Sequence, residues 1–367
     1  MNFTNQMATT SNPQQEPSIE FTYGQLTPEV LGGIIVDPAG ITSVDLTGNN
    51  ISSDDCIELV KQYISKMVNL ESLDLKDNKI GPQGAIYLFD TLRENCPHLT
   101  FLDVNENAIQ DEALYPLALL LQSVKLRTLN VVTNHITPRG LPTLCDGVVA
   151  CPTLTELSLA FNLLGDEGGI VVAQMLSNHP SLTSLDLSDN RIGDGAAVAI
   201  AEAFILSHFS RLESLNLSVN HMGDLGFQAL AEALTKTSNK NFSALDLACN
   251  DAVTDVGRAA LVQALPRMRY VYSIDLTSCD LSDENAKDLM EAIRSSRTSV
   301  GVIEWYNNPR IQLATEKALY EAIEAKAAAA RTRRSLSSDG SFFLCAGVAV
   351  TAAMVVASIL LRRPLKA

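Results

Sequence analysis

The 367-residue chain lacks the short patterns that mark most enzymes and secreted proteins. It contains no H-E-x-x-H, G-x-S-x-G or P-loop pattern, and its five histidines are not in ligand spacing. Its seven cysteines are scattered, odd in number and free of C-x-x-C pairs, a usage typical of a reducing compartment. Residues 1–20 have no basic segment and no apolar run, so no secretory signal peptide is expected there. These absences predict a protein without a cofactor or metal ion, whose first twenty residues are a disordered lead.

Basic residues are scarce through most of the chain. The 27 Lys and Arg against 42 Asp and Glu give a net charge of −15, and six of the bases lie in residues 331–367 beside one acid. Residues 1–330 therefore carry a net charge of −20. Such a charge argues against nucleic-acid binding and favours a protein partner of basic or mixed charge, and we expect no small-molecule substrate.

One phrase recurs about every 29 residues along most of the chain. It centres on an asparagine at nine positions and on a cysteine at a tenth, Cys279: Asn49, Asn78, Asn107, Asn134, Asn162, Asn190, Asn220, Asn250 and Asn308. Apolar residues precede the asparagine by eight, five and three positions, as in Leu182, Leu185 and Leu187. A fixed period between about 20 and 50 residues indicates a stacked repeat protein.

Each repeat predicts a short strand, a turn and a helix. The apolar residues at −5 and −3 have strand spacing, and those at +10 and +14, such as Leu88 and Leu92, lie on one face of a helix. A single repeat could not bury both faces, so the repeats must stack on one continuous core. The asparagine is predicted to pair with backbone groups left open by the turn, forming a ladder from repeat to repeat. Small residues at +6, such as Gly84 and Gly226, are predicted to let the helix start close to the sheet.

The pattern L-x-x-L-x-L-x-x-N-x-[IL]-x-x-x-G over residues 41 to 325 resembles the ribonuclease-inhibitor class of leucine-rich repeats, shared by NOD-like receptors and Ran GTPase-activating protein. The resemblance implies an α/β fold: a curved horseshoe of about ten repeats, with a parallel sheet on the concave face and helices on the convex face. In most relatives the concave face binds another protein.

The residue at −4 of each repeat is expected to point from the concave face. Seven of the ten are carboxylates, and neighbouring strands lie roughly 4.8 Å apart, so the acids would form two tracks with a polar gap. The ten are Asp45, Asp74, Asp103, Asn130, Ser158, Asp186, Asn216, Asp246, Asp275 and Glu304. A metal site or carboxylate dyad is one reading of these acids. We favour solvated acids with no catalytic role, which form the partner-binding face.

Residues 342–361 (FFLCAGVAVTAAMVVASILL) contain no charge. A helix of this length spans roughly 30 Å, the thickness of a bilayer's hydrocarbon core. We therefore expect a repeat domain over 21–330 with caps at both ends, a polar linker over 331–341, a transmembrane helix over 342–361 and a basic tail over 362–367. The bases flanking the span are predicted to contact the membrane: Arg333, Arg334, Arg362, Arg363 and Lys366.

Six residues follow the span, which predicts a tail-anchored protein whose repeats face the cytosol. N-x-S/T triplets at Asn2, Asn50, Asn216 and Asn241 would suit the opposite orientation, but Asn216 lies on a predicted strand, a poor place for a glycan. The alanine-rich span with basic flanks resembles anchors of the mitochondrial outer membrane, with the endoplasmic reticulum as the alternative.

Two hypotheses for function follow. The first is a membrane-anchored, non-catalytic scaffold that recruits a protein through the concave face. The second is a GTPase-activating protein similar to the Ran regulator, for which loops would have to present Arg139 or Arg191.

Overall fold

The computed structural model describes residues 18–24, 35, 37–206, 211–295 and 300–335. The chain divides into two compact units, residues 1–326 and 327–367. In the described part of the first unit, eleven strands form one parallel sheet in which each strand pairs with its neighbours in sequence. The strands are β1 (Ser18–Glu20), β2 (Ser43–Asp45), β3 (Ser72–Asp74), β4 (Phe101–Asp103), β5 (Thr128–Asn130), β6 (Glu156–Ser158), β7 (Ser184–Asp186), β8 (Ser214–Asn216), β9 (Ala244–Asp246), β10 (Ser273–Asp275) and β11 (Val302–Glu304).

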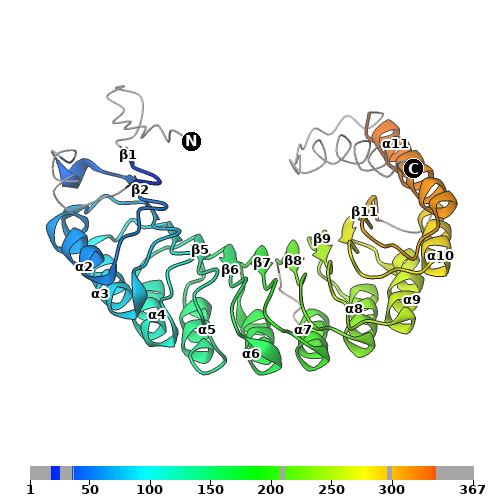
Figure 1. The fold of residues 1–367 in the computed structure, drawn as a ribbon, viewed down its shortest axis with the longest axis horizontal. Coiled ribbons are helices and arrows are strands. Elements are labelled where there is room, and N and C mark those ends of the chain that lie inside the picture. The colour runs from blue at the N-terminus through cyan, green and yellow to red at the C-terminus, as the bar shows by residue number, and fades with distance from the viewer. Residues whose placement is uncertain (1–17, 25–34, 36, 207–210, 296–299, 336–367) are drawn as a thin grey trace, which may run out of the picture. The chain divides into compact units, whose positions relative to one another are not determined.

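A helix follows each strand from β2 onward. The helices are α2 (Ser53–Gln62), α3 (Gly81–Asn95), α4 (Leu114–Ser123), α5 (Leu141–Val149), α6 (Gly165–Asn178), α7 (Asp194–Leu206), α8 (Asp224–Lys236), α9 (Asp255–Ala264), α10 (Asp283–Arg294) and α11 (Leu313–Ser335). In the first unit the strands line the inner side of an arc and the helices its outer side (Figure 1). The stack curves because neighbouring strands need roughly 4.8 Å, whereas packed helices need roughly 8–10 Å. The strand-turn-helix repeat and the parallel sheet predicted from the sequence are thus confirmed.

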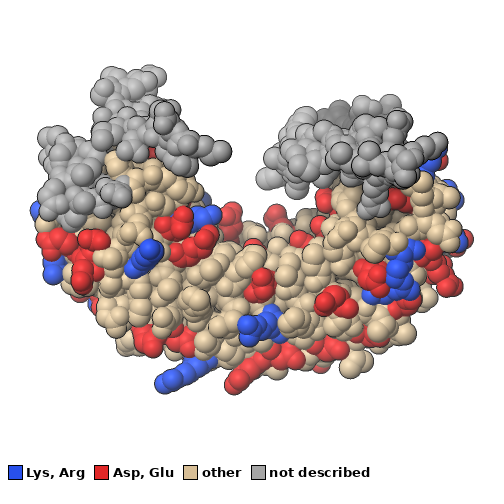
Figure 2. Space-filling view, in the orientation of Figure 1, with Lys and Arg blue, Asp and Glu red and all other residues tan. Residues whose placement is uncertain are grey.

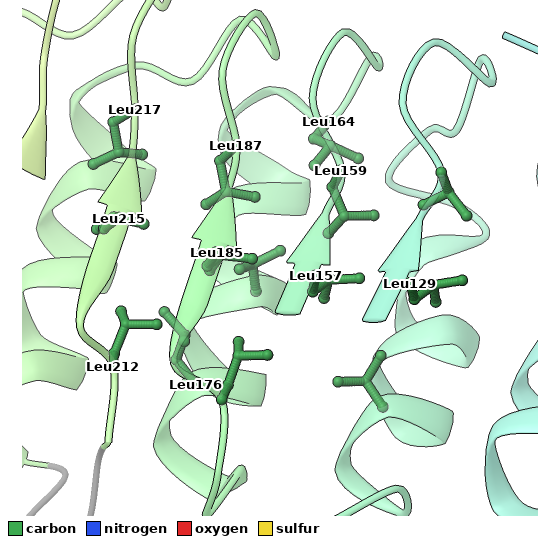
Figure 3. Packing of buried hydrophobic residues seen from close by; sticks show 14 of the residues in the cluster. Leu129, Leu157, Leu159, Leu164, Leu176, Leu185, Leu187, Leu212, Leu215 and Leu217 are labelled. Carbon is green, nitrogen blue, oxygen red and sulfur yellow. The ribbon is translucent and has the colours of Figure 1, made fainter. Parts of the chain in front are cut away.

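Leucines from the strands and helices fill the space between these two layers. Register pairing places Leu129, Leu157, Leu185 and Leu215 on neighbouring strands, at the same level of the core (Figure 3). All four side chains are almost fully buried. Burial of each leucine contributes roughly 1.5–3 kcal/mol, so the repeated apolar positions are the main source of the stability of the stack.

The asparagine of each repeat joins its own turn to the turn before it. Asn78 Nδ2 donates to Leu75 O in its own repeat at 2.8 Å and to Leu46 O in the preceding one at 3.0 Å. Its Oδ1 accepts from the backbone N–H groups of Asn49 and Ile51 at 3.0 and 2.9 Å. Because the amide both donates and accepts, one buried side chain satisfies backbone groups of two turns.

Cys279 occupies the place of this asparagine in one repeat, where a buried arginine bonds to the backbone of the turn. The thiol of Cys279 donates to Leu247 O at 3.2 Å. The buried Arg258 donates from Nε to Cys279 O at 2.6 Å and pairs with Asp255 at 2.8 Å. Arg310 also contacts Asp255, at 2.7 Å, so two arginines tie three successive repeats together at this point.

The residue before each asparagine adopts a left-handed backbone conformation, with φ between 49° and 69°. We call these positions the left-handed row: Gly48, Asp77, Glu106, Thr133, Phe161, Asp189, Val219, Cys249, Ser278 and Asn307. Only one of them is glycine, although an L-residue in this region costs roughly 1–2 kcal/mol. The sequence pattern gave no sign of this row, because nothing in its residue types favours positive φ throughout.

The sheet begins earlier than the sequence predicted. Residues 1–17 lie outside the described residues, but Ser18–Glu20 form β1 and pair with β2, so the predicted disordered lead ends before residue 20. Ile19 and Phe21 are buried at the −5 and −3 positions of this additional, eleventh repeat. Gly24 stands where the other repeats have asparagine, and its N–H donates to Asn49 Oδ1 at 3.2 Å. The missing asparagine explains why this repeat was overlooked.

Aspartates at the starts of the helices form a second ladder between repeats. Asp194, the first residue of α7, accepts through Oδ1 from the N–H groups of Gly223 and Gly226 at 2.8 Å, and so caps α8. The same relation recurs elsewhere. Asp111 accepts from Thr137 N, Asp166 from Gly193 N and Ala196 N, Asp224 from Thr254 N and Gly257 N, and Asp283 from Gln312 N.

These contacts correct the expected reason for the small residues at +6. A Cβ at Gly226 would lie 2.9 Å from Asp194 Oδ1 and 2.8 Å from Ala197 Cβ. A Cβ at Gly257 would lie 2.7 Å from Asp224 Oδ1. The glycines therefore make room for the helix and carboxylate of the preceding repeat, rather than for the sheet.

Helix α11 ends the described part of the chain. Leu319 and Ala322 are buried, and Lys326 Nζ donates to Ile293 O and Ser295 O at the end of α10, at 3.0 and 3.1 Å. The predicted transmembrane helix over 342–361 and the basic tail over 362–367 lie outside the described residues. Among the residues that are described, no helix combines the length and the apolar character needed to span a bilayer.

Candidate protein-binding site

The ten predicted inner-face residues stand side by side on consecutive strands. Strand register pairs Asp45 with Asp74 and Asp74 with Asp103, and the same register continues through to Asp275 and Glu304. Asn130 and Ser158 occupy the gap between the two acidic tracks, and Glu20 of β1 adds one acid at the first position. We call this set, from Glu20 to Glu304, the inner acidic row.

The carboxylates of the row hold the chain where each strand ends. Asp74 Oδ1 accepts from the N–H of Lys76 at 2.9 Å, two residues further on, and Asp103 does the same with Asn105. The equivalent bond recurs at Asp45, Asp186, Asp246 and Asp275, and Asn216 makes it through its amide oxygen. These acids are therefore hydrogen-bonded turn residues rather than simply solvated side chains; Asp103 is buried and the others are half-buried.

Neighbouring repeats also bond across the row. Asn130 Nδ2 donates to Asp103 Oδ2 at 2.8 Å, and Thr47 Oγ1 donates to Asp74 Oδ1 at 3.1 Å. Ser158 Oγ donates to Asp186 Oδ2 at 3.3 Å. Neutral polar side chains thus donate hydrogen bonds to the carboxylates of neighbouring repeats.

Burial raises the pKa of several of these acids, and their close spacing adds a smaller effect. Burial raises the pKa of Asp246 to about 6, and the charges of Asp275, Asp186 and Glu304 add to this effect. Burial also raises the pKa of Asp103, and to it Asp74 adds a smaller repulsion. Ionisation of the row is therefore disfavoured at Asp103 and Asp246, and a bound cation would favour the ionised form of both carboxylates.

Basic residues are almost absent from the inner face. In the four inward positions of the ten predicted repeats, −6, −4, −2 and −1, the one basic side chain is Lys76, which lies 4.0 Å from Glu106. Acidic side chains are also spread along the arc formed by the described residues of the first unit (Figure 2). A cation brought to this face would meet almost no competing charge from the protein.

Apolar side chains interrupt the acids near the middle of the left-handed row. Phe161 and Val219 are 54% and 43% exposed, and Cys249 is also exposed. The sequence analysis missed these residues because it considered only the −4 position of each repeat.

The remaining candidate residues do not form a catalytic arrangement in the part of the chain that the structure describes. Arg139 and Arg191, on which a GTPase-activating function would rely, lie in loops two repeats apart, and their side chains make no hydrogen bond to any described residue. No group of His, Cys, Asp or Glu within the described ranges could hold a metal ion. Of the predicted membrane-flanking residues, Arg333 and Arg334 fall in the final turns of α11, and Arg362, Arg363 and Lys366 lie outside the described residues.

Comparison with known proteins agrees with this architecture. A family model described as leucine-rich repeat matches residues 66–89, 95–118, 122–145, 150–173, 178–201, 211–231 and 238–262. The chain is 33% identical over 99 residues to human NACHT, LRR and PYD domains-containing protein 5, covering 27% of this chain and 8% of that protein. It is 33% identical over 136 residues to mouse ribonuclease inhibitor, covering 37% of this chain and 24% of the inhibitor.

The chain thus matches only a small part, 8% and 24%, of the length of these curated relatives. Among solved structures, an internalin of Listeria monocytogenes is similar with a TM-score of 0.49 and 19% identity, covering 82% of this chain and 84% of that one. Seven segments of this chain thus match leucine-rich repeats, and the sequence relatives support the ribonuclease-inhibitor-like class.

Proposed function

We propose that this protein is a non-catalytic scaffold that binds a protein of basic or mixed charge on the inner face of its sheet. The observation that carries the proposal is the inner acidic row, registered strand by strand, on a face whose four inward positions hold only Lys76 as a base. Such a face attracts a basic partner by long-range steering, which salt screens over roughly 8 Å at physiological ionic strength.

The hydrogen bonds that the acids make within the protein favour binding over catalysis. A general acid or base must offer its carboxylate to a substrate, but Asp74, Asp103 and Asp246 each use an oxygen to hold a backbone N–H of the following turn. Mouse ribonuclease inhibitor, one of the relatives, is by its name a protein that acts on another protein.

We further propose that residues 342–361 anchor the scaffold in a membrane, with the repeats on the cytosolic side. The uncharged composition of that segment supports an anchor. Cys56, Cys96, Cys145, Cys151, Cys249 and Cys279 are free thiols, as in a reducing compartment. Asn216, which begins one of the glycosylation triplets, is the last residue of β8. Its side-chain oxygen accepts from the N–H of Ser218 at 2.9 Å, and a glycan there would break the turn. Alanine-rich composition and basic flanks favour the mitochondrial outer membrane over the endoplasmic reticulum.

A photo-crosslinking experiment tests the scaffold. The full chain would carry benzoylphenylalanine at Ser184, on the inner face of β7, or at Tyr115, which is 63% exposed on α4. We expect protein adducts from position 184 that weaken with added salt and are absent from position 115. Equal adducts at both positions, or none at 184, would refute binding on the inner face.

The anchor has its own test. A chain truncated after Gly340 should leave the membrane fraction under carbonate extraction, whereas the full chain should remain in it. Extraction of both forms alike would exclude residues 342–361 as the anchor.

A further inference from the structure

At two positions of the left-handed row, the residue with the strained backbone conformation has an exposed apolar side chain. Phe161 and Val219 have φ of 53° and 55°, and both side chains are exposed. Asn, Asp and Gly, which occupy several other positions of the row, tolerate this conformation better than a bulky or β-branched residue. Burial does not account for either side chain, so exposed apolar residues held in a costly conformation point to a contact with another molecule.

Asp189 stands between these two side chains. Phe161 N donates to Ser188 O, and Asp189 N donates to Ser218 O, both across neighbouring turns, at 2.8 and 3.0 Å. The three residues are therefore consecutive rungs of the row. The carboxylate of Asp189 has no ion-pair partner among the described residues, and Asp186 of the inner acidic row belongs to the same repeat.

The distance between Phe161 and Val219 indicates which secondary structure of a partner could cover both side chains. Phe161 and Val219 are two strands apart, which corresponds to roughly 10 Å. An extended segment crossing the strands covers that distance in about three residues, and side chains three apart on a strand point to opposite faces. A helix covers about 10.5 Å in seven residues, which lie on the same face, and places the third and fourth residues between them.

We infer that Phe161, Asp189 and Val219 are the docking footprint for an amphipathic helix of a protein partner. The helix carries two apolar side chains seven residues apart, which cover Phe161 and Val219, and Lys or Arg between them, which pairs with Asp189 and Asp186. The inference rests on the proposed function and names the partner's shape and charge.

A synthetic stapled helix serves as the probe. It has leucines seven positions apart, arginines three and four positions after the first leucine, and alanine or glutamine elsewhere. A composition isomer has the second leucine moved two positions toward the first, so that the two leucines lie on different faces. Binding to the full chain in detergent micelles is measured by fluorescence anisotropy. We expect the isomer to bind at least about tenfold more weakly than the probe.

Protein variants locate the contact. Phe161→Asn and Val219→Asn remove the apolar groups while keeping a residue that tolerates positive φ, and each should weaken the probe about tenfold. Asp189→Asn should weaken it and flatten its salt dependence. Leu225→Gln, which alters a 63% exposed leucine in α8, is the matched control and should leave the affinity unchanged.

Equal binding of probe and isomer, wild-type affinity in Phe161→Asn and Val219→Asn, or no binding of the probe at all would each overturn the helical footprint. The proposed function is judged separately by the adducts from position 184. If these persist while the probe fails, the scaffold function stands and only the helical footprint is wrong.

Discussion

Asp194 Oδ1 accepts a hydrogen bond from the N–H of Gly226 at 2.8 Å, although the two residues belong to different repeats. The first residue of α7 thus caps the helix that follows it in the stack. Because the first N–H groups of a helix have no partner within that helix, the carboxylate both satisfies a donor and favours the positive end of the helix dipole.

Removing this cap should loosen α8. Asp194→Ala is expected to lower the free energy of unfolding by roughly 0.5–2 kcal/mol and to speed amide exchange at Gly223 and Gly226. Gly226→Ala should also destabilise, because its Cβ would clash with Asp194 and Ala197. Urea unfolding and hydrogen exchange measure both effects. Glu202→Ala, an exposed acid on α7, is the control, and an equal loss there would argue against an inter-repeat cap.

The asparagine ladder should not be uniform in strength. Asn220 donates to three carbonyls and accepts through Oδ1 from the N–H groups of Asn190 and Ile192 at 3.0 and 2.9 Å. Asn190 makes three donor bonds as well, but its Oδ1 has no partner. We expect Asn220→Ala to cost more than Asn190→Ala, within roughly 1–3 kcal/mol for each. Chemical denaturation of the two variants decides the order, and the reverse order would contradict the assignment.

Backbone strain at the proposed footprint should be measurable. Val219→Asn should raise the free energy of unfolding by about 1 kcal/mol, because asparagine tolerates positive φ better than a β-branched residue. Val68→Asn is the control, since Val68 is similarly exposed at 45% but is not among the positive-φ residues. A loss of stability in Val219→Asn would mean that the valine contributes packing that outweighs its strain.

Asp246 should make the fold more stable as its carboxylate is protonated. Its pKa is raised to about 6 by burial and by neighbouring acids, so the stabilising contribution of the neutral form is present at low pH and is lost as pH rises through about 6. Asp246→Asn keeps an acceptor for the N–H of Ala248 and should stabilise the protein above pH 6, on the order of 1 kcal/mol after solvent screening. Unfolding curves between pH 4 and 8 should converge at the acidic end. A constant difference between variant and wild type would refute a titration at this residue.

His179 should have the opposite pH dependence. Its Nδ1 accepts from the N–H of Leu182 at 3.1 Å, and Nε2 lies 3.2 Å from Cys151 O, so the ring is neutral in the fold. Burial lowers its pKa below the usual 6.5, and stability should therefore fall as pH decreases below about 6.5.

Asn239 shows how this histidine could be replaced. It lies at the equivalent position of another repeat, where Nδ2 donates to Leu212 O at 2.8 Å and Oδ1 accepts from Asn241 N at 3.0 Å. His179→Asn should therefore keep most of the stability at neutral pH and remove the loss on the acidic side. Thermal unfolding at pH 5 and pH 7.5 tests this, and an acidic loss that persists in the variant would assign it to another group.

The sequence by itself determined the repeat and its core. Leucines at fixed offsets from Asn49 to Asn308 required a strand, a turn and a helix in each repeat, and neither element could bury its apolar face without a neighbour. Local periodicity was sufficient because each repeat packs mainly on the repeats beside it. Where the local signal was missing, as at Gly24 in place of an asparagine, β1 was not predicted.

Tertiary structure decided the relations that join residues about 30 positions apart. Asp194 caps a helix that begins in the next repeat. The pKa of Asp246 is raised by burial in the stack and by the charge of Asp275, which strand register places beside it. The exposure of Phe161 and Val219 also became apparent only once the stack had placed the left-handed row along the turns. A pattern read along one repeat specifies which side chains are buried, but capping, charge repulsion and exposed surface arise between repeats.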